Sequence, residues 1–196
     1  MSRQQTSFVL AYHGCSAEVG KSIVMGEPMD ASDHAYDWLG PGIYFWESDP
    51  KRAWEWADWK VSRGDFKEAF VVGAVIDLGN CLNLMERESA EILRDAYFSL
   101  LSTIQGAGGD ANEIPTNQKG GSIDEDYKLR FRDCAVIKHL HTAYEEEKKV
   151  KFDTVRGLFI EGEELYPGSG FKKKNHIQIA VRTKESIKGK FLAKRS

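Results

Sequence analysis

Hydrophobic positions along the chain change between strand-like and helix-like spacing, which predicts a mixed fold. Short apolar runs rich in β-branched and aromatic residues predict buried strands at residues 9–13, 42–46, 69–78, 155–161 and 176–182. Apolar residues three and four positions apart predict helices at residues 17–25, 50–63, 86–104 and 124–141. The pattern contains no internal repeat, so we expect one α+β domain that spans residues 1–196.

Capping and turn residues set the expected boundaries. Ser16 is a suitable N-cap for the first helix, and Asp49 followed by Pro50 is a typical start for the second. Residues 106–121 carry five glycines, which predicts a loop or an insertion. The charged run at residues 145–149 is interpreted as a solvated connection after the last helix, and residues 161–170 as a glycine-rich acidic loop.

Composition narrows the class of protein. The 196 residues are 41% hydrophobic and 29% charged, values typical of an ordered globular domain. Cys15, Cys81 and Cys134 form no CxxC pair, so we expect neither a disulfide framework nor a zinc site, and a reducing cytoplasm as the location. Cys134, His139 and His141 share one predicted helix but lack a fourth ligand, so no metal is expected.

Two further features concern partners. No run approaches the roughly 18 apolar residues of a membrane span, and we expect no signal peptide and no membrane contact. The net charge of −3 favours neither nucleic acid nor membrane, but residues 171–196 contain nine basic residues and one acidic residue. This distribution predicts a cationic C-terminal tail.

Three segments carry candidate chemistry: Tyr12-His13-Gly14, Gly40-Pro41-Gly42-Ile43-Tyr44-Phe45, and Asn175-His176-Ile177-Gln178-Ile179. Their order resembles the signature of the diphtheria-toxin-like ADP-ribosyltransferases, the group that includes the poly(ADP-ribose) polymerases. That signature is a His-Gly pair, a Tyr in a GxGIYF-like strand before a helix, and a Glu on a late strand. The resemblance extends from Phe8 to about Phe191, and the segment GPGIYFWESDPKRAWEWA is its most specific part.

The resemblance implies a fold and an activity. It implies an ADP-ribosyltransferase-like split β-sheet core, made of two small packed sheets with flanking helices, and cleavage of the nicotinamide–ribose bond of NAD+ as co-substrate. A Rossmann dinucleotide site is rejected, because Gly40 and Gly42 lack the third glycine and precede a strand, where that motif precedes a helix.

The resemblance also assigns roles to residues. Gly14 allows close approach of a carboxamide, and the His13 imidazole suits a ribose hydroxyl. The Tyr44 ring would stack on nicotinamide, with Trp56, or with lower preference Trp54, on the other side. His13, Tyr44 and Gln178 are therefore the candidate catalytic residues, and His13, Gly14, Tyr44 and Trp56 the candidate donor site.

One position departs from the family pattern, because Gln178 stands where the late strand of the family carries its catalytic Glu. An amide keeps the hydrogen bond but loses a Coulomb interaction of about 4 kcal/mol at ~4 Å and an effective dielectric of about 20. That loss corresponds to a rate lower by roughly 100- to 1000-fold. Three explanations stay open: slow chemistry, a charge supplied by Glu161, Glu163 or Glu164, or a charge supplied by the acceptor. A domain that binds NAD+ or ADP-ribose without turnover is the alternative.

The loop before the last strand touches the acceptor in this family. Here that loop contains Glu161, Glu163, Glu164, Phe171, Lys172, Lys173 and Lys174. An aromatic beside three lysines favours a nucleic acid (RNA or DNA) as acceptor, with protein acceptors and simple NAD+ hydrolysis as alternatives. By analogy alone, a small free-standing transferase is similar to intracellular toxins of toxin–antitoxin or anti-phage defence systems, which would imply a neutralising antitoxin protein.

Overall fold

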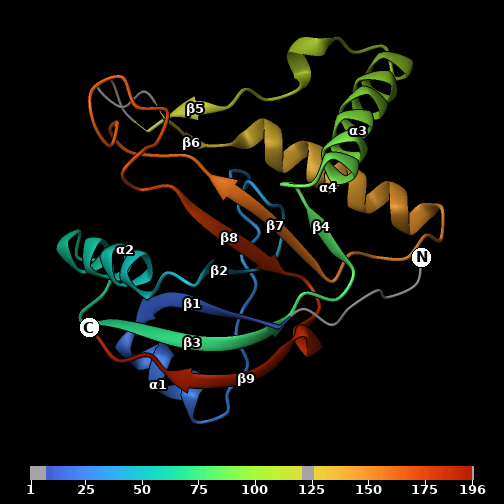
Figure 1. The fold of residues 1–196 in the computed structure, drawn as a ribbon. Helices are drawn as coiled ribbons and strands as arrows, with labels where there is room; N and C mark the ends of the chain where they lie inside the picture. The colour runs from blue at the N-terminus through green and yellow to red at the C-terminus, as the bar shows by residue number, and fades with distance from the viewer. Residues whose placement is uncertain (1–7, 121–125, 196) are drawn as a thin grey trace.

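A computed structural model describes residues 8–120 and 126–195 of the chain. It has an α+β fold in which most described strands form one mixed sheet of seven strands (Figure 1). The strands of this sheet, in spatial order, are β4 (Cys81–Asn83), β7 (Thr154–Phe159), β8 (His176–Val181), β2 (Ile43–Glu47), β1 (Phe8–Ser16), β3 (Ala69–Asp77) and β9 (Ile187–Leu192). Only the β4–β7 pair is parallel, and a separate small sheet pairs β5 (Gln118–Lys119) with β6 (Tyr127–Leu129).

The sheet narrows between β1 and β2. Two residue pairs, Ala11–Glu47 and Tyr12–Trp46, join these strands, whereas β1 pairs with β3 over its full length. The β1-β3-β9 strands and the β2-β8-β7-β4 strands therefore run in different directions in Figure 1. The expected α+β class is confirmed. The strands form one continuous sheet with a narrow junction, whereas two separate small sheets were expected.

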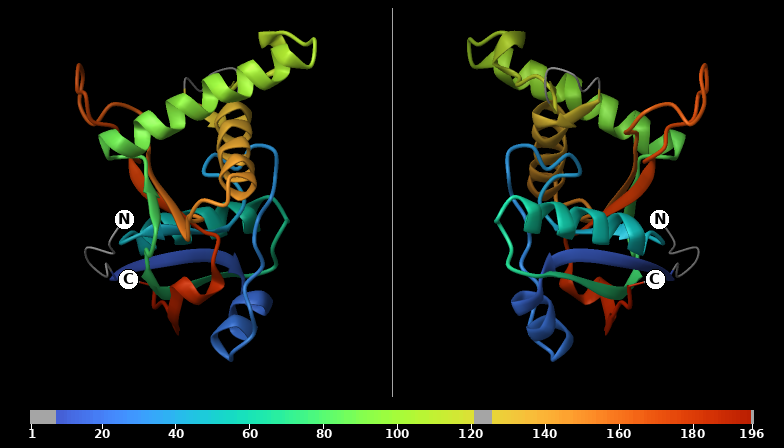
Figure 2. Two further views of the ribbon diagram at one scale, coloured as in Figure 1. Left: turned by 90° about the vertical axis from the view of Figure 1, so that its right-hand side faces the viewer. Right: turned by 90° about the vertical axis from the view of Figure 1, so that its left-hand side faces the viewer.

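Helices cover both faces of this sheet. The helices are α1 (Ala17–Val24), α2 (Pro50–Ser62), α3 (Arg87–Gly106) and α4 (Phe131–Glu146). Helices α1 and α2 lie on opposite sides of the β1-β3-β9 half (Figure 2). Helices α3 and α4 pack on the half that contains β7 and β8, through a cluster that includes Ile137, Leu140 and Val155.

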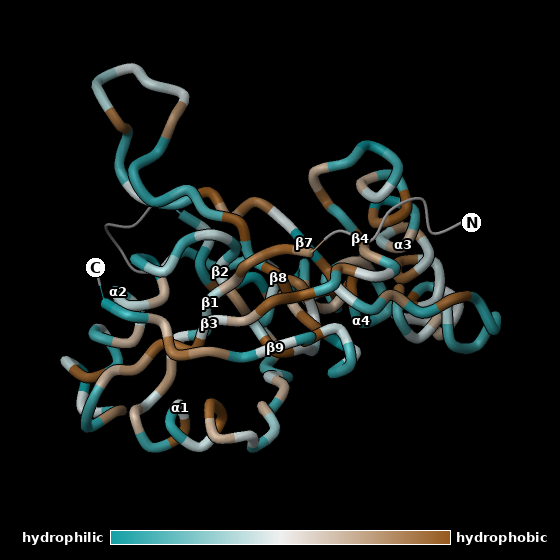
Figure 3. Tube along the Cα trace, turned by 60° about the horizontal axis from the view of Figure 1, so that its bottom comes forward, coloured by the Kyte–Doolittle hydropathy of each residue, from teal (hydrophilic) through white to brown (hydrophobic). Residues whose placement is uncertain are grey.

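The apolar runs of the sequence lie on the strands of this sheet, as Figure 3 shows. Alternate positions of β2 and β8 point to different cores: Phe45 and Ile179 belong to the cluster that α1 covers, whereas Tyr44 and Ala180 contact the cluster under α3 and α4. Burial on both faces explains why these strands read as continuous apolar runs.

The predicted helix at residues 124–141 is wrong in its boundaries. Residues 124 and 125 lie outside the described residues, residues 127–129 form strand β6, and α4 begins only at Phe131. The first turn of α4 is held by a residue outside the helix, because the side-chain oxygen of Asn117 accepts a hydrogen bond from the backbone N–H of Arg132 at 2.9 Å. The run at residues 145–149 is also no simple connection, since α4 continues through Glu146.

Several basic residues of the cationic C-terminal tail are paired with acids. Lys172 contacts Asp126, Lys173 contacts Glu163 at 2.9 Å, Lys188 lies 3.7 Å from Asp77, and Arg195 contacts Asp58. The tail also forms strand β9, which the sequence did not predict; it is an edge strand paired with β3 and contains Lys188 and Lys190. The described part of the chain contains no helix long and apolar enough to cross a membrane.

His141 on α4 makes folding stability sensitive to acid. Its ring is buried, and neither ring nitrogen has a hydrogen-bond partner among the described residues. Burial, and next the nearby Arg182, lower the pKa of His141 from 6.5 to about 4. The unfolded chain therefore takes up a proton as the pH falls through 6.5, whereas the folded chain stays neutral until about 4, so stability is lost across this window.

Between pH 7 and pH 5, the wild-type protein should lose about 2 kcal/mol more unfolding free energy than the His141→Leu variant. Urea unfolding at the two pH values measures this difference. Ile23→Val on α1 supplies the control, because it removes a buried methylene group and no titratable group, so it should lower stability at both pH values and leave the difference unchanged. An equal acid sensitivity in wild type and His141→Leu would contradict the assignment.

Candidate functional site

The His13 ring lies where β1 and β2 separate. Its Nδ1 is 2.8 Å from the backbone oxygen of Tyr44, and its ring centroid is 5.7 Å from that of Phe45. A carbonyl oxygen only accepts, so Nδ1 carries the proton and donates it. Burial lowers the pKa of His13, partly offset by this hydrogen bond. The neutral ring therefore has Nε2 as its acceptor nitrogen.

Gly14 lies against helix α2. A Cβ at this position would be 2.6 Å from the backbone oxygen of Ala53 and 3.1 Å from a ring carbon of Trp56. The backbone oxygen of Leu10 accepts a hydrogen bond from Ser48 N–H, on the β2 side of β1. Because main-chain groups alternate along a strand, those of Gly14 also point to the β2 side, beyond the last β1–β2 residue pair. The backbone of Gly14 thus faces the opening between the strands.

Tyr44 holds the loop that precedes its own strand. Its hydroxyl donates to the backbone oxygen of Gly40 at 2.9 Å and accepts the N–H of Leu39 at 3.0 Å. Burial, and next the charge of Asp37, raise the pKa of this phenol well above its usual range. The half-buried ring packs on the cluster under α3 and α4. Because its hydroxyl is already hydrogen-bonded, Tyr44 would contact a ligand through the face of its ring.

Gln178 belongs to a hydrogen-bonded chain of side chains. Its Oε1 accepts the indole N–H of Trp38 at 2.7 Å, and its Nε2 is 3.0 Å from Nε2 of His176. His176 Nδ1 is 2.7 Å from the backbone oxygen of Lys174 and therefore donates, which leaves Nε2 as the acceptor of the Gln178 N–H. Trp38 only donates, so the two partners fix the orientation of the amide.

His176 is buried and neutral. Its ring stacks on Phe159 at 5.4 Å and 17° and lies 6.3 Å from the Trp46 ring. Burial lowers the pKa of His176, and the positive charge of Arg52 lowers it further, against the opposing influence of Glu161 and of the Lys174 hydrogen bond. The late strand thus presents two uncharged polar side chains, at positions 176 and 178.

Trp46 and Trp56 form the side of the site next to α2. Their ring centroids are 5.9 Å apart, and the Arg52 guanidinium lies 6.0 Å from the Trp46 centroid. The indole N–H of Trp46 is buried without a hydrogen-bond partner among the described residues. Of the two candidates on this helix, Trp56 is the one beside Gly14, whereas Trp54 contacts Arg195.

The three acidic loop residues have different environments. Glu161 is 5% exposed and forms an ion pair with Arg52, whose Nε is 3.1 Å from its Oε1. Glu163 is exposed beside Lys173, and Glu164 accepts the N–H of Gly168 at 2.8 Å within the loop. Only Glu161 therefore lies close to His176, and its charge is offset by Arg52.

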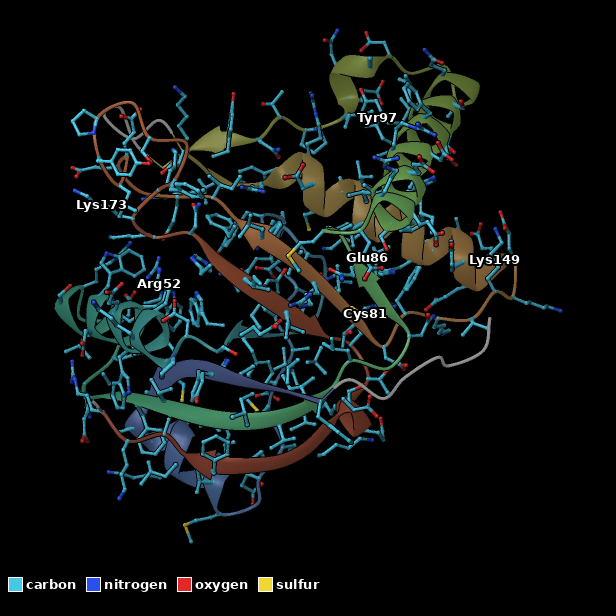
Figure 4. The ribbon with its side chains drawn as sticks, viewed as in Figure 1. Arg52, Cys81, Glu86, Tyr97, Lys149 and Lys173 are labelled. Atoms are coloured by element: carbon cyan, nitrogen blue, oxygen red, sulfur yellow. The ribbon has the colours of Figure 1, made fainter. Side chains whose placement is uncertain are left out.

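The loop at residues 161–174, for which the resemblance implies acceptor contacts, projects beyond the ends of β7 and β8, and Figure 4 labels Lys173 on it and Arg52 on α2. Phe171 is 66% exposed, and Leu165 and Tyr166 are also exposed. Lys172 and Lys173 lie on carboxylates, so the loop is less cationic than its sequence suggests. Lys174 donates its backbone N–H to the Glu161 oxygen at the base of the loop.

The three sequence segments meet at one place in the sheet, but their side chains divide between its faces. Strands β1, β2 and β8 are neighbours, and Trp46 pairs with Tyr12 on one side and Gln178 on the other. Tyr44 and Gln178 therefore share a face of the sheet with Trp46. His13 follows Tyr12 by one residue, so its side chain lies on the other face, beside Phe45. The structure brings Gly14, Trp56, Tyr44 and Gln178 to one side and His13 to the fork between the strands.

Sequence reasoning missed His176, Trp46, Trp38 and Arg52. His176 and Trp46 were detectable, since each is two residues from a candidate on the same strand and so shares its face. Trp38 precedes the GPG segment in a stretch without periodicity, and only the fold brings it to Gln178. Arg52 lies in the first turn of α2, and its contact with Glu161 spans 109 residues.

Two surface depressions lie away from this region. One is lined by Ser99, His139 and Tyr144 between α3 and α4, and the other by Tyr97 and Arg132. Both are open, and both include charged residues in their lining. The hydrogen-bonded cluster of Trp38, Gln178 and His176, on β8 and the loop before β2, is the better candidate site, because its side chains are fixed by mutual hydrogen bonds and burial perturbs the pKa of His176.

Gln178→Glu should convert the neutral pair into an ion pair. A carboxylate at position 178 would face the lone pair of His176 Nε2, and protonation of His176 would turn repulsion into attraction. We expect the pKa of His176 to rise by about 1–3 units relative to wild type. NMR titration of the histidine ring signals in wild type and in Gln178→Glu measures the pKa of His176. An unchanged His176 pKa would contradict the hydrogen bond between these two side chains.

No family model, no curated protein and no solved structure matches this chain.

Proposed function

We propose that this chain is an ADP-ribosyltransferase that uses NAD+ as co-substrate. The observation that carries the proposal is the arrangement of the three signature segments on adjacent strands, β1, β2 and β8, around the opening that begins after Tyr12 and Trp46. A narrow junction between two halves of a sheet is what a split-sheet transferase core requires. The order, strand context and spatial meeting of the segments support the family resemblance together.

The donor would lie against Gly14, Tyr44 and Trp56. The Gly14 backbone would bond the carboxamide, and the Tyr44 and Trp56 rings would enclose the pyridinium. Nε2 of His13 would accept a ribose hydroxyl, because Nδ1 is engaged by Tyr44. In the reaction, the bond between ribose C1′ and the nicotinamide nitrogen breaks, its electron pair leaves with nicotinamide, and an acceptor nucleophile bonds to C1′ with loss of its proton.

The charge available to stabilise the ribosyl cation is small. Gln178 is neutral, His176 is neutral, and the Glu161 carboxylate is paired with Arg52. We therefore expect slow turnover unless the acceptor supplies negative charge. The same observation favours the second candidate function, a module that binds NAD+ or ADP-ribose without turnover.

The acceptor we propose first is a nucleic acid, with protein as the alternative. Exposed Phe171 at the loop supports base stacking, whereas the carboxylate partners of Lys172 and Lys173 reduce the attraction for phosphates. A cytoplasmic toxin or defence effector with an antitoxin partner is the biological role that we propose, by analogy alone.

Incubation with labelled NAD+ and a cell lysate tests the function. We expect label in macromolecules that is released by nuclease and resists protease. Label that resists nuclease and is lost with protease would identify a protein acceptor. Free ADP-ribose without macromolecular label would identify a glycohydrolase, and bound but intact NAD+ would identify the binding module.

A further inference from the structure

Arg130 is a half-buried cation held on two aromatic rings. Its guanidinium carbon lies 4.8 Å from the Trp38 centroid and 4.4 Å from the Phe159 centroid. It is the residue immediately before α4, so its backbone position is fixed by β6 on one side and the helix on the other. The rings orient the planar guanidinium and shield one part of it from water.

Most N–H donors of the Arg130 guanidinium have no hydrogen-bond partner in the described part of the chain. A guanidinium has five N–H donors, and among the described residues only Nε makes a hydrogen bond, to the Tyr127 oxygen at 3.1 Å. Among the described residues Asp133 forms an ion pair with Arg130, in which Nη1 and Oδ2 are 3.7 Å apart, beyond hydrogen-bond distance. Burial lowers the pKa of Arg130 against the influence of Asp133 and Asp126. In the described part of the chain, no carboxylate therefore hydrogen-bonds to this guanidinium.

The rings that hold Arg130 are those that hold the polar pair of the candidate site. Trp38 donates its indole N–H to Gln178, and Phe159 stacks on His176. The Trp38 and Phe159 centroids are 5.2 Å apart. Trp38 and Phe159 thus contact both the Arg130 guanidinium and the polar pair of Gln178 and His176. Arg130 lies next to the start of α4, and 19% of its side chain is exposed.

We propose that Arg130 binds a phosphate group, specifically the pyrophosphate of the dinucleotide donor. This inference rests on the proposed function, because it takes NAD+ as the ligand of the Gln178 site. The two terminal nitrogens match the bidentate geometry of phosphoryl oxygens, and a ligand anion would accept the hydrogen bonds that Asp133, at 3.7 Å, does not accept. The donor then extends from Gly14 and Trp56 across Gln178 toward the start of α4.

Calorimetric titration with ADP-ribose and with inorganic pyrophosphate tests the proposal. Arg130→Gln should weaken both affinities about tenfold or more, because hydrogen bonds to a charged group are lost. Arg130→Lys should weaken them less, since it keeps the charge and loses the planar fork. The matched control is Arg94→Gln on the exposed surface of α3, which should change neither affinity.

Nicotinamide serves as the second ligand, since it carries no phosphate. Its binding should be equal in wild type and Arg130→Gln, which also shows that the variant is folded. Unchanged pyrophosphate and ADP-ribose affinities in Arg130→Gln would overturn the Arg130 site while nicotinamide binding still supports the proposed function. Absence of binding of all three ligands to the wild-type protein would overturn both.

Discussion

His13→Ala is expected to lower the rate of nicotinamide release from NAD+ by about 100-fold, because a charge-developing transition state loses a hydrogen bond in a desolvated position. The ring is neutral, its Nδ1 donates to the Tyr44 oxygen, and its Nε2 is the nitrogen left for a ribose hydroxyl. Release of nicotinamide, measured by chromatography under saturating NAD+, gives the rate.

Two variants separate chemistry from folding at this position. His13→Asn retains an amide N–H that can donate to the Tyr44 oxygen, so it should keep the fold and still lose the Nε2 function. His34→Ala removes an exposed histidine and should leave the rate unchanged. Full turnover by a folded His13→Asn variant would remove His13 from the donor site.

Gly14→Ala is expected to lower the unfolding free energy by about 3 kcal/mol, at the upper end of the overpacking range. The added methyl would lie 2.6 Å from the Ala53 backbone oxygen, and a backbone atom of a packed helix cannot rotate away as a side chain can. Displacement of α2 would also move Trp56 and Arg52, so donor binding should be lost together with stability.

Gly189→Ala is the matched control, because a Cβ there would meet no atom within 4 Å. Urea unfolding should therefore separate the two alanine variants, with a clear loss for Gly14→Ala and little change for Gly189→Ala. Equal stabilities would mean that α2 adjusts without cost and that Gly14 is not required by its packing.

Two central strands of the sheet were predicted most accurately from the sequence. β3 and β8 were predicted within one or two residues, because branched apolar side chains are needed on both sides of a central strand. β9 was missed because an edge strand exposes one side and tolerates Lys188 and Lys190, which read as part of a cationic tail. The start of α4 depends on Asn117, whose contact with Arg132 no local pattern reveals.

The candidate site was predictable in part for the same reason. Gly14, Tyr44 and Gln178 stand out in short segments, and their strands are neighbours in the sheet. What the segments could not reveal is the pairing of side chains across the chain: Gln178 with Trp38 and His176, Glu161 with Arg52, and Lys172 with Asp126. The two ion pairs offset charge within the site, and the Arg52 pair reduces the negative charge expected from the acidic loop.

The most direct test of the proposed function is the release of nicotinamide from NAD+ by the purified protein, alone and with cell lysate as a source of acceptors. The account predicts slow release that is faster with lysate, is lost in His13→Asn, and is retained in His34→Ala. Intact NAD+ after prolonged incubation in both conditions would contradict the transferase assignment.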